Sequence, residues 1–190
     1  MPMWSLEEIT GFTRARITAT RFRHVEGVME TAKALAKRHG VDPEAANLAA
    51  LVHDVAKEQN IQQVKRILML QYEEAYLEHS SKIWHAPMGA IVGRETFGIE
   101  DQDVLNAIKF HTTGRPGMSD LEKVIFVADY TEPNRTYEGC EAVRELWGNL
   151  DEAVCEILRQ KIEKVASTNP EASHPDTTAA YAYYKELTGA

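Results

Sequence analysis

The feature that most constrains this fold is an apolar helical stretch with a histidine and an aspartate inside it. The stretch runs from Asp42 to Lys57 and contains His53-Asp54. Asp42 is a favourable N-cap, and Pro43 suits the first helical position. The residues that follow are apolar on nearly every side, so we expect a helix in the middle of the domain. A charged aspartate there is costly unless it is paired or bound to a metal ion.

The rest of the chain predicts an all-α protein. Hydrophobic residues recur at helical spacing throughout, and no convincing alternating strand is present. We expect one domain over residues 1–190, because no repeat or linker divides the chain. The expected helices cover about 5–17, 21–39, 42–57, 61–77, 84–97, 101–111, 119–131, 140–147, 150–167 and 176 onward.

Composition excludes several classes of protein. The formal net charge of -8 argues against general binding to nucleic acid or membrane surfaces. It leaves room for a phosphate-bearing substrate, because a local basic patch can lie on an acidic protein. No apolar run is long enough to span a bilayer, and the N-terminus has no signal-peptide pattern. The two cysteines are too few for a disulfide framework, so we expect a cytoplasmic protein.

Several potential metal ligands fall at inward positions of the expected helices. Each of these residues, considered singly, has an ordinary explanation. A buried histidine is usually hydrogen-bonded to a neighbour, and a buried aspartate such as Asp54 is usually paired with a lysine or arginine. Many such groups aimed at one interior would destabilise each other without a cation. Mixed nitrogen and oxygen donors suit iron, manganese or zinc, and spacing does not decide among them. The inward set is His24, His53, Asp54 and Asp129, with His85 and His111 at helix ends.

Five segments in order resemble a known family. They read RFRHVEGV at 21–28, HDVAK at 53–57, WHAPMGA at 84–90, HTTGRPGM at 111–118 and ADYTEPNR at 128–135. The chain resembles the HD superfamily of metal-dependent phosphohydrolases and, within it, the bacterial YqeK-type symmetrical diadenosine tetraphosphate hydrolases. The resemblance implies an HD-domain helical bundle with a metal site at its centre. It also implies a motif-bearing core over about 21–135 and C-terminal helices that complete the nucleotide pocket. It also implies one or two divalent ions, with iron expected first, and a homodimer is compatible with it.

The resemblance assigns roles to individual residues. The implied metal ligands are His24, His53, Asp54 and Asp129. The implied catalytic residues are Asp54, Lys57, His85 and His111. The implied substrate-binding residues are Arg21, Lys57, His85, His111, Thr112, Arg135, His174, Pro175, Asp176 and Thr177. The segment around His174 matches less closely, and that histidine can contact either a base or a phosphate.

The chemistry is consistent with these roles. Hydrolysis of a polyphosphate requires neutralised charge on the phosphate oxygens and a hydroxide near neutral pH, and a metal ion supplies both. A metal-bound hydroxide would cleave diadenosine tetraphosphate into two ADP, and Asp54 could bridge two ions. Two alternatives stay open: an HD phosphohydrolase for nucleoside mono- or triphosphates, and a non-catalytic nucleotide sensor. The complete ligand set argues against the sensor.

Overall fold

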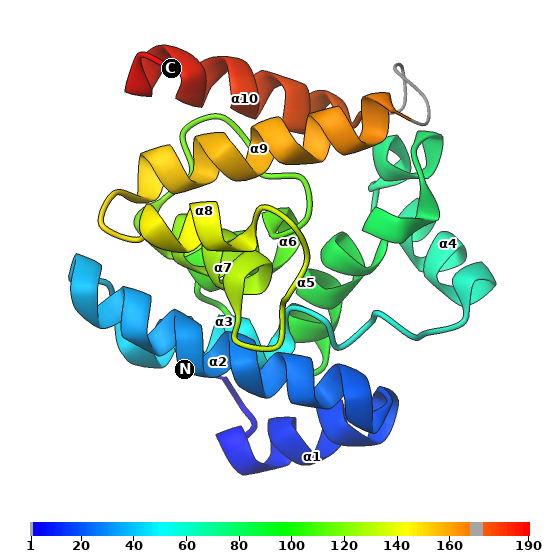
Figure 1. Ribbon diagram of the computed structural model, residues 1–190. Coiled ribbons are helices and arrows are strands. Elements are labelled where there is room, and N and C mark those ends of the chain that lie inside the picture. Colours follow the sequence, from blue (N-terminus) through cyan, green and yellow to red (C-terminus); the bar gives the residue numbers. More distant parts are fainter. Residues whose placement is uncertain (1, 168–172) are drawn as a thin grey trace.

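The computed structural model describes residues 2–167 and 173–190. In these ranges it contains helices and no strand, as predicted (Figure 1). The α-helices are α1 (Leu6–Arg16), α2 (Ala19–His39), α3 (Pro43–Val52), α4 (Ile61–Leu70), α5 (His85–Glu95), α6 (Gln102–Phe110), α7 (Asp120–Thr131), α8 (Cys140–Glu145), α9 (Leu150–Ala166) and α10 (Pro175–Thr188). Two short 3-10 helices, η1 (Glu74–Glu78) and η2 (Ser81–Ile83), join α4 to α5.

Helix α2 is the long element on which the site is built. The Thr18 hydroxyl accepts a hydrogen bond from the Arg21 amide at its start, and Gly40 ends it in the left-handed conformation at φ 70°. Its apolar stripe, which includes Val25 and Leu35, is buried against α3 and α7. His24 lies on this buried face, so the sequence periodicity placed it correctly.

The predicted helix from Asp42 to Lys57 is shorter in the structure. Helix α3 ends at Val52, His53 is its C-cap, and Asp54 lies in the turns that follow. The Val55 amide donates to the Val52 carbonyl and the Lys57 amide to the Asp54 carbonyl, which are tight i to i+3 bonds. His53 still has helical backbone angles, whereas Asp54 lies in the turns beyond the regular helix.

The segment after α4 also differs from the prediction. A continuous helix to about Leu77 was expected, but α4 ends at Leu70 and the chain turns at Tyr72, which has a φ of 59°. The chain then enters η1, where Tyr76 is buried. The remaining helix boundaries agree with the expected ones to within two residues.

The C-terminal helices cover the end of the molecule opposite α1. Helix α9 packs on both α7 and α10, and the α9–α10 pair lies along the top of the view in Figure 1. Helix α4 projects at the right-hand side of that view, near η1. Among the described helices, none combines the length and apolar character that crossing a bilayer would require.

Candidate metal centre

Six side chains from five parts of the chain converge inside the bundle. Helix α2 contributes one residue, the turn after α3 two, the start of α5 one, the end of α6 one and α7 one. All are buried except the last, which is partly exposed. In that order they are His24, His53, Asp54, His85, His111 and Asp129.

Two histidine nitrogens face two carboxylates without forming hydrogen bonds. The Nε2 atom of His24 lies 3.0 Å from Asp129 Oδ1 and 3.7 Å from Asp54 Oδ2. The Nε2 atom of His53 lies 3.5 Å from Asp54 Oδ2 and 3.8 Å from Asp129 Oδ1. Both Nε2 atoms are buried and lack a hydrogen-bond partner among the described residues. Buried polar atoms normally have partners, so this arrangement indicates donors aimed at a shared cation.

In His53 and His111, the hydrogen bond made by the Nδ1 atom fixes the tautomer of the ring. His53 Nδ1 donates to the Ala50 carbonyl over 2.6 Å, and His111 Nδ1 donates to the Ile108 carbonyl over 2.7 Å. Because a carbonyl can only accept, the proton of the neutral ring lies on Nδ1, and Nε2 then carries the lone pair. A metal-binding histidine usually has such a partner on its second nitrogen.

His24 is held in the same way by a residue that the sequence analysis did not assign. Its Nδ1 lies 3.0 Å from Glu132 Oε1, and Glu132 is buried. Glu132 lies within the motif segment 128–135, but no role was assigned to it. The contact joins residues 108 positions apart, so no local spacing could have revealed it.

Asp54 turns its two oxygens towards two different groups of histidines. Oδ2 faces His24 and His53, whereas Oδ1 lies 3.2 Å from His85 Nε2 and 3.8 Å from His111 Nε2. The Nε2 atoms of His85 and His111 are 3.1 Å apart. Within residues 2–167 and 173–190, two sets of donors are compact enough to hold an ion. They are His24, His53 and Asp129, and His53, Asp54 and His111.

The electrostatics of the two groups differ. Burial favours neutral carboxyl groups, but the neighbouring histidines outweigh it and hold the pKa values of Asp54 and Asp129 well below their usual range. Burial opposes a charge on His53, yet Asp54 and Asp129 raise its pKa. At His85 and His111, the carboxylates act to raise the pKa. Burial, together with neighbouring histidines or Lys57, has the larger and opposite effect. The pKa of His85 is lowered, and that of His111 is lowered further.

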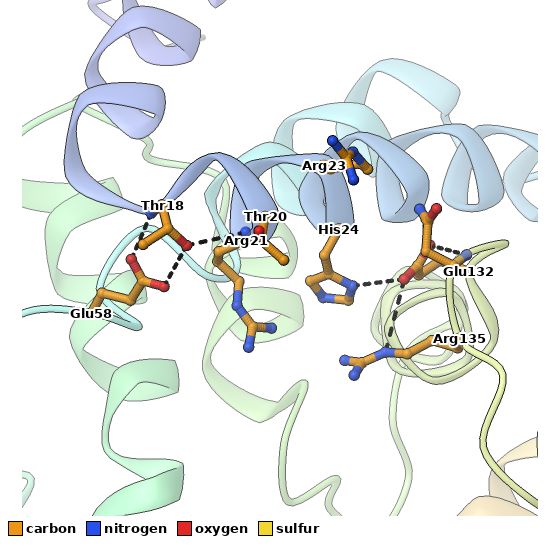
Figure 2. A pocket seen from close by; sticks show the side chains of 9 residues that line it. Thr18, Thr20, Arg21, Arg23, His24, Glu58, Glu132 and Arg135 are labelled. Carbon is orange, nitrogen blue, oxygen red and sulfur yellow. Dashed lines mark hydrogen bonds and ion pairs between the residues drawn. The ribbon is translucent and has the colours of Figure 1, made fainter.

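Three cationic side chains surround the histidines and carboxylates. Arg21 Nη1 lies 3.1 Å from Asp54 Oδ2, and Arg135 Nη2 lies 3.3 Å from Asp129 Oδ1. Figure 2 shows these two arginines on opposite sides of the His24 ring, in a hollow of about 330 Å³. Lys57 Nζ lies 3.3 Å from each ring nitrogen of His85. Arg21, Lys57 and Arg135, which belong to the sequence motifs, therefore lie beside the candidate ligands.

A larger cavity opens on the other side of Arg135. It has a volume of about 860 Å³, which is within the usual range for small-molecule sites. Its lining includes Asp129, Tyr130, Arg135, Tyr137, Gln160 and Lys161. Sequence analysis missed Lys161. A signal was available, because Lys161 continues the buried stripe of Val154 and Leu158 on α9.

The remaining predicted substrate residues are absent from the linings of these two cavities. The Thr112 carbonyl accepts a hydrogen bond from Lys161, and the Thr177 hydroxyl donates to the Thr113 carbonyl. His174 caps α10 by accepting from the Asp176 amide, and its ring stacks on Tyr76 with 5.0 Å between centroids. Pro175 is the first residue of α10. No direct contact joins residues 174–177 to the six converging side chains in the described parts of the chain.

The donor set fits a divalent metal ion. Imidazole nitrogens and carboxylate oxygens are ligands of first-row transition metals. The unpartnered Nε2 atoms of His24 and His53 supply an observation that packing alone does not explain.

Comparison with known proteins agrees with this geometry. Residues 21–134 match the HD domain family. A crystal structure from Clostridium acetobutylicum, described as a predicted HD superfamily hydrolase involved in NAD metabolism, superposes with a TM-score of 0.92 and 35% identity. The alignment covers 97% of this chain and 99% of that one.

Two named bacterial relatives indicate a narrower group within the HD domain family. A Bacillus subtilis protein named bis(5'-nucleosyl)-tetraphosphatase, symmetrical, is 40% identical over 92% of this chain and 95% of its own length. A protein of the same name from Halalkalibacterium halodurans is 44% identical over 88% of this chain and 90% of its own. The chain therefore belongs to the HD-domain family, in the group of these bacterial proteins. Membership of this family implies a divalent metal ion, and the histidine and aspartate groups described above could bind one.

Proposed function

We propose that the chain hydrolyses diadenosine tetraphosphate symmetrically into two molecules of ADP. The observation that carries this proposal is the arrangement around Asp54, with histidines beyond both carboxylate oxygens and arginines flanking His24. The relatives named as symmetrical bis(5'-nucleosyl)-tetraphosphatases supply the substrate class. The mixed nitrogen and oxygen donors suit iron, manganese or zinc, and iron is our first choice because of the family resemblance.

The site residues have three proposed roles, which are metal binding, phosphate binding and proton transfer. When bound, the metal ion provides Lewis-acid chemistry and lowers the pKa of water. His24, His53, Asp54 and Asp129 are the proposed ligands, and Glu132 orients His24. Arg21 and Arg135 bind phosphate oxygens, because guanidinium groups can grip them in a bidentate manner.

His85 and His111, which face Asp54 Oδ1, are assigned to substrate binding and proton transfer. His85 lies between Lys57 and Asp54, and burial lowers the pKa of its ring, which favours proton exchange at Nε2. His111 is assigned to the phosphates or to a second ion. We assign Thr112 and residues 174–177 to contacts with the nucleotide, with His174 facing either the base or a phosphate.

The reaction has a defined atom balance. Water adds to one of the two central phosphorus atoms, and the bond from that phosphorus to the bridging oxygen breaks. One ADP gains the water oxygen, the other retains the bridging oxygen, and protons leave to the solvent or to the departing phosphate. Positioning selects this bond, because a displacement of about 1 Å can cost roughly a hundredfold in rate.

Product analysis tests this function. Metal-loaded protein is incubated with diadenosine tetraphosphate, and nucleotides are separated by chromatography at early times. We expect ADP alone. Equal amounts of ATP and AMP would contradict symmetrical cleavage, and activity on nucleoside mono- or triphosphates would favour the other phosphohydrolase function. Nucleotide binding without any product would favour the sensor.

A further inference from the structure

We propose that Lys161 is a further substrate-binding residue, whose ammonium group contacts phosphate oxygens of one nucleoside diphosphate half. This inference rests on the proposed function and extends it, because no segment of the motif region contains Lys161. It places a phosphate contact on α9, outside the residues 21–134 that match the family.

The position of Lys161 supports a role in the site. It lines the 860 Å³ cavity together with Asp129 and Arg135, so it faces the same space as a proposed metal ligand and a proposed phosphate contact. Its Nζ donates to the Thr112 carbonyl over 2.7 Å, and Thr112 follows His111 in the chain. Asp129, Lys57 and Arg135 all act electrostatically on Lys161, so the cation lies within range of the metal centre.

The surroundings of Lys161 are unfavourable for a cation. Its Nζ lies 4.8 Å from the centroid of the Phe126 ring, and no carboxylate among the described residues forms an ion pair with it. Burial lowers its pKa to about 8, and Asp129 only partly offsets this effect. A cation removed from water without a carboxylate partner carries an energetic cost. An anion that enters the cavity would offset this cost by pairing with the ammonium group.

Comparison with the other lysines strengthens the inference. Four lysines are partly buried in the described chain: Lys57, Lys109, Lys123 and Lys161. Lys109 pairs with Glu73 at 2.6 Å, and Lys123 pairs with Asp151 at 2.8 Å. The two without an ion pair both adjoin the metal centre, Lys57 beside His85 and Lys161 in the Asp129 cavity. Missing carboxylate partners therefore coincide with the place where phosphate charge is expected.

The hydrogen bond to Thr112 offers a purely structural alternative. In that case Lys161 would serve only to hold the backbone next to His111, and its charge would be irrelevant. A glutamine at this position retains a neutral donor, whereas methionine retains the length of the side chain but no donor. Comparison of Lys161→Gln with Lys161→Met therefore separates the charge from the hydrogen bond.

The experiment measures binding of ADP and of inorganic pyrophosphate to metal-loaded protein by calorimetry, with bound metal quantified in every variant. We expect Lys161→Met and Lys161→Gln to weaken both ligands by roughly 10- to 100-fold, the scale of a hydrogen bond to a charged group. Lys161→Arg should stay within a few-fold of the unmodified protein. The control is Lys33→Met, which removes one exposed positive charge from α2 and should change nothing.

Two results would overturn the inference. Unchanged affinity in Lys161→Gln would show that the hydrogen bond alone matters, and unchanged affinity in both neutral variants would show that Lys161 does not contact phosphate. If Lys161→Met fails to fold, Lys161→Gln against Lys161→Arg still compares a neutral with a charged donor. These binding measurements do not depend on which bond is cleaved, so failure of the product test is separate from failure here.

Discussion

The two sides of Asp54 differ in charge although they share one carboxylate. On the Oδ2 side, His24 and His53 face a second carboxylate, Asp129, whose pKa is held low by the nearby rings. On the Oδ1 side, His85 and His111 have lowered pKa values, and the next charged group is Lys57, a cation. One side therefore combines two carboxylates with the flanking Arg21 and Arg135, whereas the other combines imidazoles of lowered pKa with a single lysine.

This difference indicates how the work is divided. Anionic oxygens with free imidazole nitrogens favour a tightly bound cation. Neutral imidazoles beside an ammonium group suit phosphate oxygens, or a second and weaker ion that shares Asp54 and His53. The same carboxylate can link both tasks because its two oxygens face opposite groups.

The largest effect is expected at His53, which belongs to both donor sets. His53→Ala should abolish stoichiometric metal binding and lower turnover by roughly a thousandfold. It should also lower the melting temperature, because ligand binding no longer stabilises the folded state. Metal analysis, kinetics and calorimetry on freshly purified protein test this. His39→Gln at the end of α2 is the control, and full metal content in His53→Ala would refute the ligand assignment.

Loss of His111 should separate the two sides. His111→Ala should lower turnover by about a hundredfold, the scale of one proton-transfer or charge-stabilising group, and leave the first metal in place. The measurement is metal per chain alongside initial rates. A fall from two equivalents to one would sharpen the comparison by showing a second ion on the Oδ1 side. Loss of all metal would contradict the division.

Glu132 tests the Oδ2 side through its orientation of His24. Glu132→Gln keeps the size of the side chain but weakens its charge-assisted contact with His24 Nδ1. We expect roughly 10- to 100-fold weaker metal affinity, the usual cost of removing such a supporting contact. Competition with a chelator measures it. Excess metal should restore most of the turnover, and a variant that stays inactive at saturating metal would show that Glu132 has another role.

The smallest effect is expected at Arg135, which lies between both hollows. Arg135→Ala should raise the KM for diadenosine tetraphosphate about tenfold and lower turnover, because one charged phosphate contact is lost. Metal content should be unchanged, and Arg135→Lys should recover part of the KM. Arg94→Ala, an exposed arginine paired with Glu95, is the control. Reduced metal content in Arg135→Ala would place this residue in support of Asp129 instead.

Much of the fold followed from local sequence signals. Ser119 and Glu122 form a capping box at the start of α7, and Gly40 ends α2 in the left-handed conformation. These signals act over a few residues, so a single sequence contains them in full. The predicted helices past Val52 and Leu70 were wrong, because helical spacing of apolar residues does not record where tight turns replace the regular helix.

The features of the candidate site also fall into two groups, those that local sequence indicates and those that packing determines. The chemical types and order of His24, His53-Asp54 and Asp129, and the basic residues beside them, could be taken from the sequence. The opposed directions of the two Asp54 oxygens could not, and neither could the Glu132 support for His24. Those features depend on the packing of α2, α3 and α7, which local spacing does not encode.

The sequence by itself determined which segments become helices and which side chains can hold a metal ion or a phosphate, because caps, periodicity and donor chemistry are local properties. Only the tertiary structure decided which of those groups meet. His24 reaches Glu132 across 108 positions, and Lys161 reaches Thr112 across 49. Such contacts arise from burial of apolar faces between distant helices, a non-directional force that leaves no fixed spacing in the chain.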